Sequence, residues 1–442
     1  IDFYHMQTAY KCIDDWFNKH GHRRQHAADE FYGYLFKTVK VIWYEAPSKL
    51  DSATLFTRLN VGRIPLTNAE LVKALLLSSE RDRAEEIATF WDVIERDLQV
   101  PGIWSFVTDA NAEDYPTRIN LILDTIAGGP TGPRRPLFHT FDTLRDEMES
   151  SSPYQVWRKI VNLHGLILGW HANRDFYHKI GYLVASGSSF ADLVSLAQGC
   201  TKTDFMSLLD QEIRERLKLT KDEVADLGYE NQPQKCEQLL LLMNVETVRR
   251  LENSSERYPF YVHASKGWSL EHIHAQNAES LTKEEQWKEW LRLHRNALDS
   301  LPTAMKNKGR YAILVQEIDA IKEPIGRAAF QKIAKDVTEI FTNEQGLGTL
   351  HSMHAVSNLA LLSKDDNSAL GNSVFEVKRQ HILDMDRKGS FIPICTRQVF
   401  LKYYTDADAQ QIHFWGAQDR ESYLEAIKEV LKDYFRPEEK QP

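Results

Sequence analysis

Closely spaced cysteines are missing from this sequence. Its 442 residues include only 4 cysteines, and none forms a Cys-x-x-Cys pair (Cys12, Cys200, Cys236 and Cys395). Disulfide-stapled secreted domains and thiolate zinc sites both need cysteines at short, recurring spacings. The composition therefore argues against both classes and predicts a protein of the reducing cytoplasm.

Long apolar runs and a positive net charge are missing as well. No uninterrupted apolar stretch approaches the roughly 20 residues that span a bilayer, and no secretory signal is visible, so no membrane segment is expected. The formal net charge of −9 disfavours a protein that coats nucleic acid over its whole surface. A local basic groove remains compatible with it, because phosphate binding depends on where the charges lie.

Phosphate-loop motifs and internal repeats are absent too. The segment Gly128–Pro136 (GGPTGPRRP) lacks the spacing and the Lys-Ser/Thr pair of a phosphate-binding loop. Its prolines also remove backbone donors, so we expect a surface loop there. No fixed-period repeat or low-complexity segment is found.

What the sequence does contain is mostly helical periodicity, over a length that predicts two or three domains. We expect a mainly α (α+β) multidomain protein with a small ββα-metal (His-Asn-His) motif in its carboxy-terminal half. The expected parts are residues 1–80, a helical middle domain over 81–245, and a third domain over 246–442 with a helical insertion at 283–345.

A few local signals are sharper than this periodicity. Thr67 and Glu70 have the spacing of a helix-capping box. The aromatic run Tyr258–His263 predicts an extended segment, and Trp268–Gln276 predicts a strand paired with it. The apolar run Leu359–Leu362 predicts a further strand.

Two distant stretches carry the residue types that phosphodiester hydrolysis needs. They are Ser269–Gln276 (SLEHIHAQ) and Ser357–Asn367 (SNLALLSKDDN). The reaction needs an activated water, a stabiliser of charge on the phosphoryl oxygens, and help for the leaving oxygen. A histidine can take the proton from water, and a hard divalent cation held by carboxylate and amide oxygens can serve the phosphate. The matching residues are Glu271, His272, Asn358 and Asn367.

Strand geometry and simpler interpretations restrict this hypothesis. Neighbouring side chains of a regular strand face opposite ways, so Glu271 and His272 enter one site only where the strand ends or bends. His272 and His274 share a face, which makes a two-histidine metal site geometrically easier. Asparagines are common in turns, a Glu-His pair is more often a surface or capping pair, and the basic residues over 378–402 also suit a solvated face. The hypothesis rests on the combination.

Leu270–Gln276 and Val356–Arg379 resemble the carboxy-terminal His-Asn-His nuclease domain of the GmrSD-type, modification-dependent restriction endonucleases. That family's pattern is an acid-His-Ile-x-Pro-Gln strand, Gly-Asn-Leu-x-Leu-Leu-Ser, a further Asn, and a Phe-x-x-Lys helix. This sequence has Glu-His-Ile-His-Ala-Gln at 271–276, Ser-Asn-Leu-Ala-Leu-Leu-Ser at 357–363, Asn367, and Phe-Glu-Val-Lys at 375–378. It departs at Ala275 and Ser357, where Pro and Gly are usual, and both changes leave the chemical groups in place.

A second resemblance covers residues 41–77. The matching residues are Leu-Phe-Thr-Arg-Leu-Asn at 55–60, Gly62, Pro-Leu-Thr at 65–67 and Glu-Leu-Val-Lys at 70–73. They look like the end of the family's ParB-like amino-terminal domain, whose Asp-Gly-Gln-Gln-Arg signature is linked to nucleotide hydrolysis and sensing. This sequence lacks that signature and begins abruptly at Ile1. We therefore expect residues 1–80 to be a remnant of that domain, with any NTP site in a region missing from this chain.

The resemblance implies roles for the matched residues. His272 would be the general base that activates water, and Asn358 would complete the catalytic pair by orienting the imidazole or the strand. Glu271 and Asn367 would hold a single Mg²⁺ or Mn²⁺, with His274 as a further candidate ligand.

The substrate implied by the resemblance is DNA, either modified or from phage. Gln276, Lys378 and Arg379 would contact its phosphates, and the basic residues over 378–402 would give salt-dependent, largely sequence-independent affinity. His354 is an additional candidate for the site. The expected protein is a DNA endonuclease or nickase of a bacterial antiviral restriction system, acting in the cytoplasm as a homo-oligomer or with a partner subunit.

Three alternatives stay open. A DNA-binding scaffold with an inactive nuclease fold would bind DNA without cutting it. A nucleotide-hydrolysing sensor of DNA modification would release phosphate without strand scission. A ribonuclease would prefer structured RNA over plasmid DNA.

Overall fold

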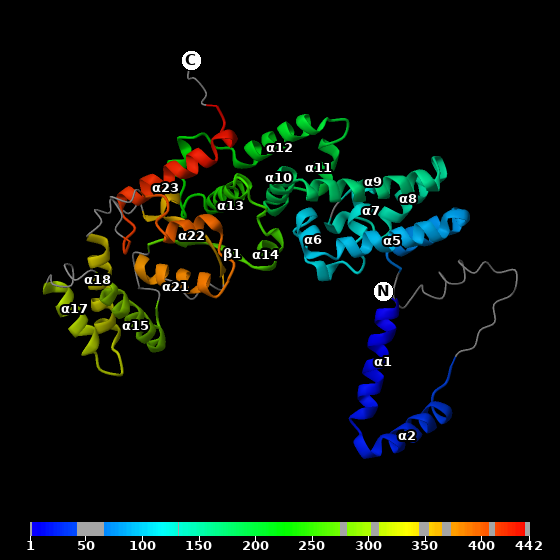
Figure 1. Cartoon of the computed structure of the whole chain (residues 1–442), viewed down its shortest axis with the longest axis horizontal. Coiled ribbons are helices and arrows are strands. Elements are labelled where there is room, and N and C mark those ends of the chain that lie inside the picture. Colours follow the sequence, from blue (N-terminus) through cyan, green and yellow to red (C-terminus); the bar gives the residue numbers. More distant parts are fainter. Residues whose placement is uncertain are drawn as a thin grey trace. The chain divides into compact units, whose positions relative to one another are not determined.

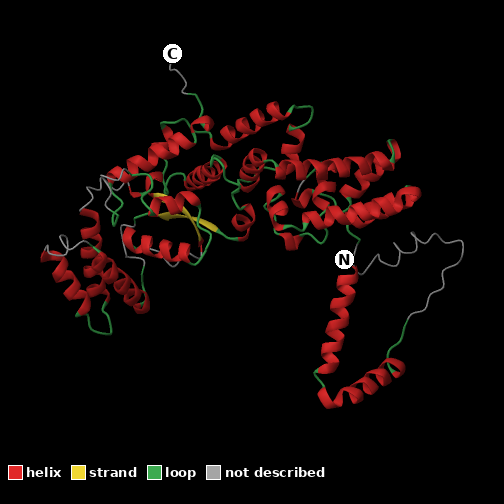
Figure 2. Ribbon diagram, viewed as in Figure 1, coloured by secondary structure: helices red, strands yellow, loops and turns green. Residues whose placement is uncertain are grey.

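The computed structural model describes residues 2–41, 66–130, 132–274, 281–301, 309–343, 353–364, 373–405 and 412–437. The prediction of a mainly helical protein is confirmed, since these residues form 19 α-helices and one small two-stranded antiparallel sheet (Figure 2). The helices are α1 (Asp2–Asn18), α2 (Arg24–Lys37), α4 (Asn68–Ser79), α5 (Ala84–Leu98), α6 (Pro101–Val107), α7 (Asn120–Ala127), α8 (His139–Ser150), α9 (Pro153–Ala172), α10 (Arg174–Ala185), α11 (Phe190–Leu196), α12 (Lys202–Leu217), α13 (Pro233–Arg249), α14 (Phe260–Ser265), α15 (Glu284–Ser300), α17 (Gly309–Asp319), α18 (Arg327–Asn343), α21 (Phe375–Arg387), α22 (Ile394–Phe400) and α23 (Ala417–Val430). The strands are β1 (Trp268–His272) and β2 (Leu359–Ser363).

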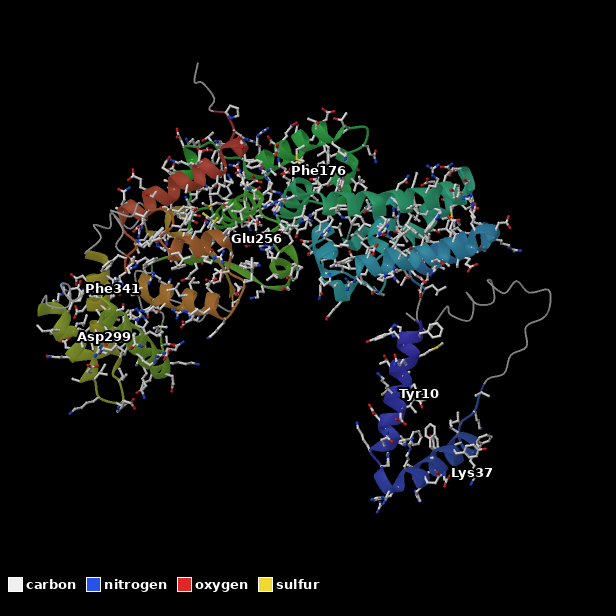
Figure 3. The ribbon with its side chains drawn as sticks, in the orientation of Figure 1. Tyr10, Lys37, Phe176, Glu256, Asp299 and Phe341 are labelled. Carbon is white, nitrogen blue, oxygen red and sulfur yellow. The ribbon has the colours of Figure 1, made fainter. Side chains whose placement is uncertain are left out.

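The chain divides into two compact units, Ile1–Leu66 and Thr67–Pro442. In the described part of the first unit, α1 and α2 bury a single side chain, Ala27. Tyr10 on α1 and Lys37 at the end of α2 are labelled in Figure 3. None of the described helices is long and apolar enough to cross a membrane.

The second unit begins with the predicted capping box, which is confirmed. The Thr67 hydroxyl accepts a hydrogen bond from the Glu70 backbone N–H at 3.2 Å, and the Glu70 carboxylate accepts one from the Thr67 N–H at 2.8 Å. The helix that follows, α4, packs on α5 and α8. One hydrophobic core runs from Ala69 of α4 to Tyr434 near the end of the described chain. The predicted boundaries at residues 80 and 245 fall inside this unit, and the three-part division stays a prediction.

The two strands form the sheet that positions the candidate site. β1 pairs antiparallel with β2 in a register that sets Trp268 opposite Ser363 and His272 opposite Leu359. Every residue of β2 is buried, because α13 and α22 both pack against it. This burial explains its continuous apolar run. Figure 1 shows β1 beside the orange helices α21 and α22.

Between β1 and β2 the chain forms α15, α17 and α18, inside the expected insertion at 283–345. These helices enclose a second hydrophobic core, which includes Trp287, Phe330 and Phe341 (the last labelled in Figure 3). Val377 of α21 also belongs to this core. The insertion therefore packs against the helix that follows the sheet, and α15 contacts α21.

The predicted extended segment Tyr258–His263 is wrong. Residues 260–265 form α14, which begins after Pro259 and contacts α6 and α10. The ring of Phe260 packs so closely over Gly181 that any Cβ there would collide with it. Tertiary packing thus overrides the local β-propensity of this aromatic run. The predicted strand Trp268–Gln276 also ends earlier, at His272.

Candidate active site

The site lies where β1 ends. Glu271 and His272 are the last two residues of the strand, and their side chains have different partners. Glu271 bonds to Lys378 on α21, whereas His272 bonds to His354, just before β2. The alternation of strand side chains is therefore kept to the end of β1. The chain beyond the strand is fixed by Asn358, whose carbonyl accepts from the Ile273 N–H at 2.8 Å.

Lys378 joins the strand to the helix. Its ammonium donates to the Glu271 carboxylate and, at 2.6 Å, to the backbone carbonyl of His272. The Lys378 side chain is 1% exposed and that of Glu271 is 9% exposed. Burying one of these charges without the other would cost several kcal/mol, so each requires the other. This pair ties α21 to the end of β1.

The His272 imidazole is half-buried among cations and another imidazole. Its Nε2 lies 3.1 Å from Nδ1 of His354, and the Tyr229 ring centroid lies 5.1 Å from that of His272. Burial lowers the pKa of His272 to about 4, with smaller contributions from the positive charge of Lys378, from His354 and from Arg420. The ring is therefore neutral near pH 7, with one nitrogen lone pair available as a hydrogen-bond acceptor.

Asn358 holds the chain that leaves β1. Its side-chain NH₂ donates to the His274 carbonyl at 3.0 Å and to the Met353 carbonyl at 2.7 Å, and its Oδ1 accepts from the His274 N–H at 3.2 Å. Asn358 is fully buried. It contacts no side chain in these three bonds, so in this structure it orients the backbone beside His272.

His274, the candidate further ligand, lies in a different environment. Its Nδ1 accepts a hydrogen bond from the backbone N–H of Phe375, the first residue of α21, at 3.3 Å. The side chain is fully buried, and burial lowers its pKa to about 3. The imidazole thus satisfies one of the free N–H groups that every helix presents at its start.

The described residues do not by themselves fit a divalent cation. Mg²⁺ and Mn²⁺ take several oxygen ligands, and no group of three or more His, Cys, Asp or Glu converges in the described part of the chain. Glu271 supplies a carboxylate there, and it is bound by the ammonium of Lys378. Asn367 and Gln276 lie outside the described residues.

The basic residues of the 378–402 segment divide into two kinds. Lys378 is buried, Arg379 lies 3.7 Å from the Glu376 carboxylate, and Lys402 is buried against Asp419. The remaining ones lie at or near the surface, where Arg387 pairs with Asp384 at 3.1 Å and Arg397 with Asp386 at 3.4 Å: Arg387, Lys388 and Arg397. Lys378 and Arg379, predicted to contact phosphates, have internal partners here.

Three residues near His272 are not identified by any pattern in the sequence. Tyr229 and Glu230 come from the segment before α13, and Arg420 comes from the first turn of α23. Arg420 is buried, and its guanidinium donates to the Met353 sulfur at 3.4 Å. All three lie far from His272 along the chain, so only the tertiary fold could reveal them.

Comparisons of the chain with protein-family models, with curated proteins and with solved structures found no match. The resemblance to the restriction nucleases therefore stays a prediction based on the matched residues. Any function has to be argued from the geometry around His272.

Proposed function

We propose that this protein is a DNA endonuclease that hydrolyses phosphodiester bonds with His272 as its general base, in the manner of the His-Asn-His (ββα-metal) nucleases. The observation that carries the proposal is the convergence of three distant segments. β1 ends at His272, Asn358 just before β2 fixes the backbone beside it, and Lys378 of α21 bonds to both Glu271 and the His272 carbonyl. Strand, strand and helix thus surround one neutral imidazole.

The chemistry follows from the charges around that imidazole. A neutral His272 has a lone pair that can take a proton from water. The positive charge of Arg420, which contributes to the lowered pKa of His272, would attract a phosphate group placed against the ring. The negative charge of that phosphate would raise the pKa of His272 back toward the neutral range, where a general base works best.

The surface cations supply affinity for the substrate. Arg387, Lys388 and Arg397 belong to α21, α22 and the turn between them. Contacts of this kind with phosphates release counterions and carry no base specificity. The proposed substrate is double-stranded DNA, modified or foreign to the host, in a bacterial cytoplasm.

A divalent cation held by Glu271 and Asn367 is proposed from the resemblance alone, because the Glu271 carboxylate is bound by the ammonium of Lys378. Bound Mg²⁺ or Mn²⁺ would stabilise charge on the phosphoryl oxygens. Control of the activity by an NTP, by a partner subunit or by a second copy of the chain is proposed from the resemblance alone.

The decisive experiment is nicking of supercoiled plasmid DNA by the His272→Ala variant, in Mg²⁺, in Mn²⁺ and in EDTA. Removing a general base lowers the rate on the order of 100-fold or more. His381→Ala is the matched control, because His381 lies half-buried on α21 and has no part in the proposed chemistry. It should cut at the wild-type rate.

Each alternative predicts a different result. Undiminished nicking by His272→Ala would defeat the assignment of the base. DNA binding without nicking favours the scaffold, phosphate release from NTP without nicking favours the sensor, and faster cleavage of structured RNA favours the ribonuclease.

A further inference from the structure

The segment before α13 pairs with the segment before β2. Gly228 forms an antiparallel bridge with Ala355, the Tyr229 N–H donates to the His354 carbonyl at 2.8 Å, and the Val356 N–H donates to the Leu227 carbonyl at 2.8 Å. A Cβ at position 228 would lie 2.9 Å from the His354 carbonyl oxygen, so this approach requires glycine. The pairing fixes the backbone on both sides of His354.

A chain of polar contacts leads from this pairing to the candidate base. The Glu230 carboxylate lies 3.5 Å from Nε2 of His354, and Nδ1 of His354 lies 3.1 Å from Nε2 of His272. The Glu230 side chain is 74% exposed and that of His354 is 32% exposed. These polar contacts therefore connect the surface to the half-buried ring of His272.

The charge of the Glu230 carboxylate favours one tautomer of each ring. A neutral His354 with its proton on Nδ1 would present the Nε2 lone pair to the negative charge of Glu230, which is repulsive. With the proton on Nε2, His354 donates toward Glu230 and its Nδ1 accepts. His272 must then carry its own proton on Nε2, and its Nδ1 holds the lone pair.

We infer that Glu230 and His354 are positioning residues that hold His272 in the tautomer whose Nδ1 acts as the base. The inference rests on the proposed function, which it deepens. It requires no change in the charge of any group. Among the described residues, other groups around His272 are the ammonium of Lys378, the guanidinium of Arg420 and the ring of Tyr229. Nε2 of His272 lies against Nδ1 of His354.

The sharpest test is Glu230→Lys in the full chain. A lysine would donate to Nε2 of His354, so that His354 would carry its proton on Nδ1 and donate it to Nε2 of His272. His272 would then carry its own proton on Nδ1. We expect nicking to slow on the order of tenfold, as is typical for loss of an outer partner. Glu230→Ala should slow it less. Asp222→Lys is the matched control, because it makes the same charge change at an exposed position eight residues earlier in the sequence. It should leave the rate unchanged.

His354 is tested by a pair of variants. His354→Ala removes the acceptor for His272 Nε2, and we expect on the order of a tenfold loss of rate. His354→Asn keeps a side-chain oxygen near the position of Nδ1 and should restore part of that loss.

The tautomer itself is read by ¹⁵N NMR of histidine-labelled protein, with His272 assigned from its substitution. The wild type should carry the proton on Nε2, and Glu230→Lys should move it to Nδ1. The same tautomer in both proteins, or equal nicking rates in a wild type and a Glu230→Lys variant that both cut DNA, would overturn the inference. If Glu230→Lys moves the proton as expected but the wild type cuts no nucleic acid, the proposed function fails while the arrangement of Glu230, His354 and His272 stands.

Discussion

At the scale of single residues, the pair of Lys378 and Glu271 is the strongest constraint on the site. Both side chains are buried, so removing one leaves an uncompensated charge. We expect Lys378→Met to lower the free energy of unfolding by about 3–5 kcal/mol. The double variant with Glu271→Leu should recover much of this loss, because two apolar groups need no partner.

Urea denaturation of the two single variants and the double variant measures the coupling. Glu425→Gln is the control, since Glu425 pairs with Lys428 at 2.9 Å while 60% exposed. Loss of this exposed ion pair should lower the free energy of unfolding by less than about 1 kcal/mol. A double variant no more stable than Lys378→Met alone would contradict the account of this pair.

Strand alternation predicts that Glu271 and His272 face opposite ways, and their different partners agree with it. The partners themselves could not be predicted. The local sequence does not distinguish a buried lysine on a helix from a solvated one. It therefore predicts that Lys378 contacts DNA. Glu230 and Arg420 reach the surroundings of His272 only because α13 and α23 pack beside the sheet.

At the scale of elements, the start of α21 depends on two neutral histidines. The Phe375 N–H donates to Nδ1 of His274, and the Val374 N–H donates to Nε2 of His294. His294 lies on α15, and burial lowers its pKa to about 3, as it does for His274. Protonating either ring removes an acceptor from the end of a helix.

The sign of the pH effect follows from these pKa values. Both folded-state values, about 3, lie below the unfolded value near 6.5, so the unfolded chain binds more protons between these limits. This contribution to stability is complete above about pH 6.5 and is lost progressively as the pH falls toward 3. At pH 5 each histidine should lower the free energy of unfolding by about 2 kcal/mol relative to its value above pH 6.5.

The variant His294→Gln isolates one of these two contributions, since its amide oxygen can accept from Val374 without titrating. Urea denaturation at pH 7 and pH 5 should show a smaller difference between the two pH values than in the wild type. His178 and His263, whose pKa values burial also lowers, to about 4, contribute equally to both proteins. An unchanged difference would mean that His294 is not neutral in the native state.

The elements that local chemistry determines could be predicted well. The Thr67–Glu70 box uses groups three residues apart, and the apolar run of β2 reflects burial on both faces. The Tyr258–His263 segment shows the limit. Its aromatic composition suits a strand, but Pro259 and the fit of Phe260 over Gly181 produce a helix. Packing partners nearly eighty residues away determine the secondary structure of such a segment.

At the scale of the whole molecule, the two units differ in how they bury apolar surface. The two cores found among the described residues contain no member before Ala69. The first unit instead leaves large apolar side chains exposed on both helices, among them Phe3, Tyr10 and Trp16 of α1 and Phe31 and Phe36 of α2. Exposed apolar patches of this kind drive association in water.

We therefore expect a fragment of residues 67–442 to fold like the full chain and to self-associate less. Its thermal midpoint should agree with that of the main transition of the full chain within about 2 °C, because neither described core loses a side chain. It should also nick plasmid DNA at the same rate, since every residue assigned to the site follows Thr67. Light scattering after size exclusion reports the association, and Trp16→Ser in the full chain provides a milder control. A fragment that melts well below the full chain, or that loses nicking while staying folded, would show that the first unit stabilises or controls the second.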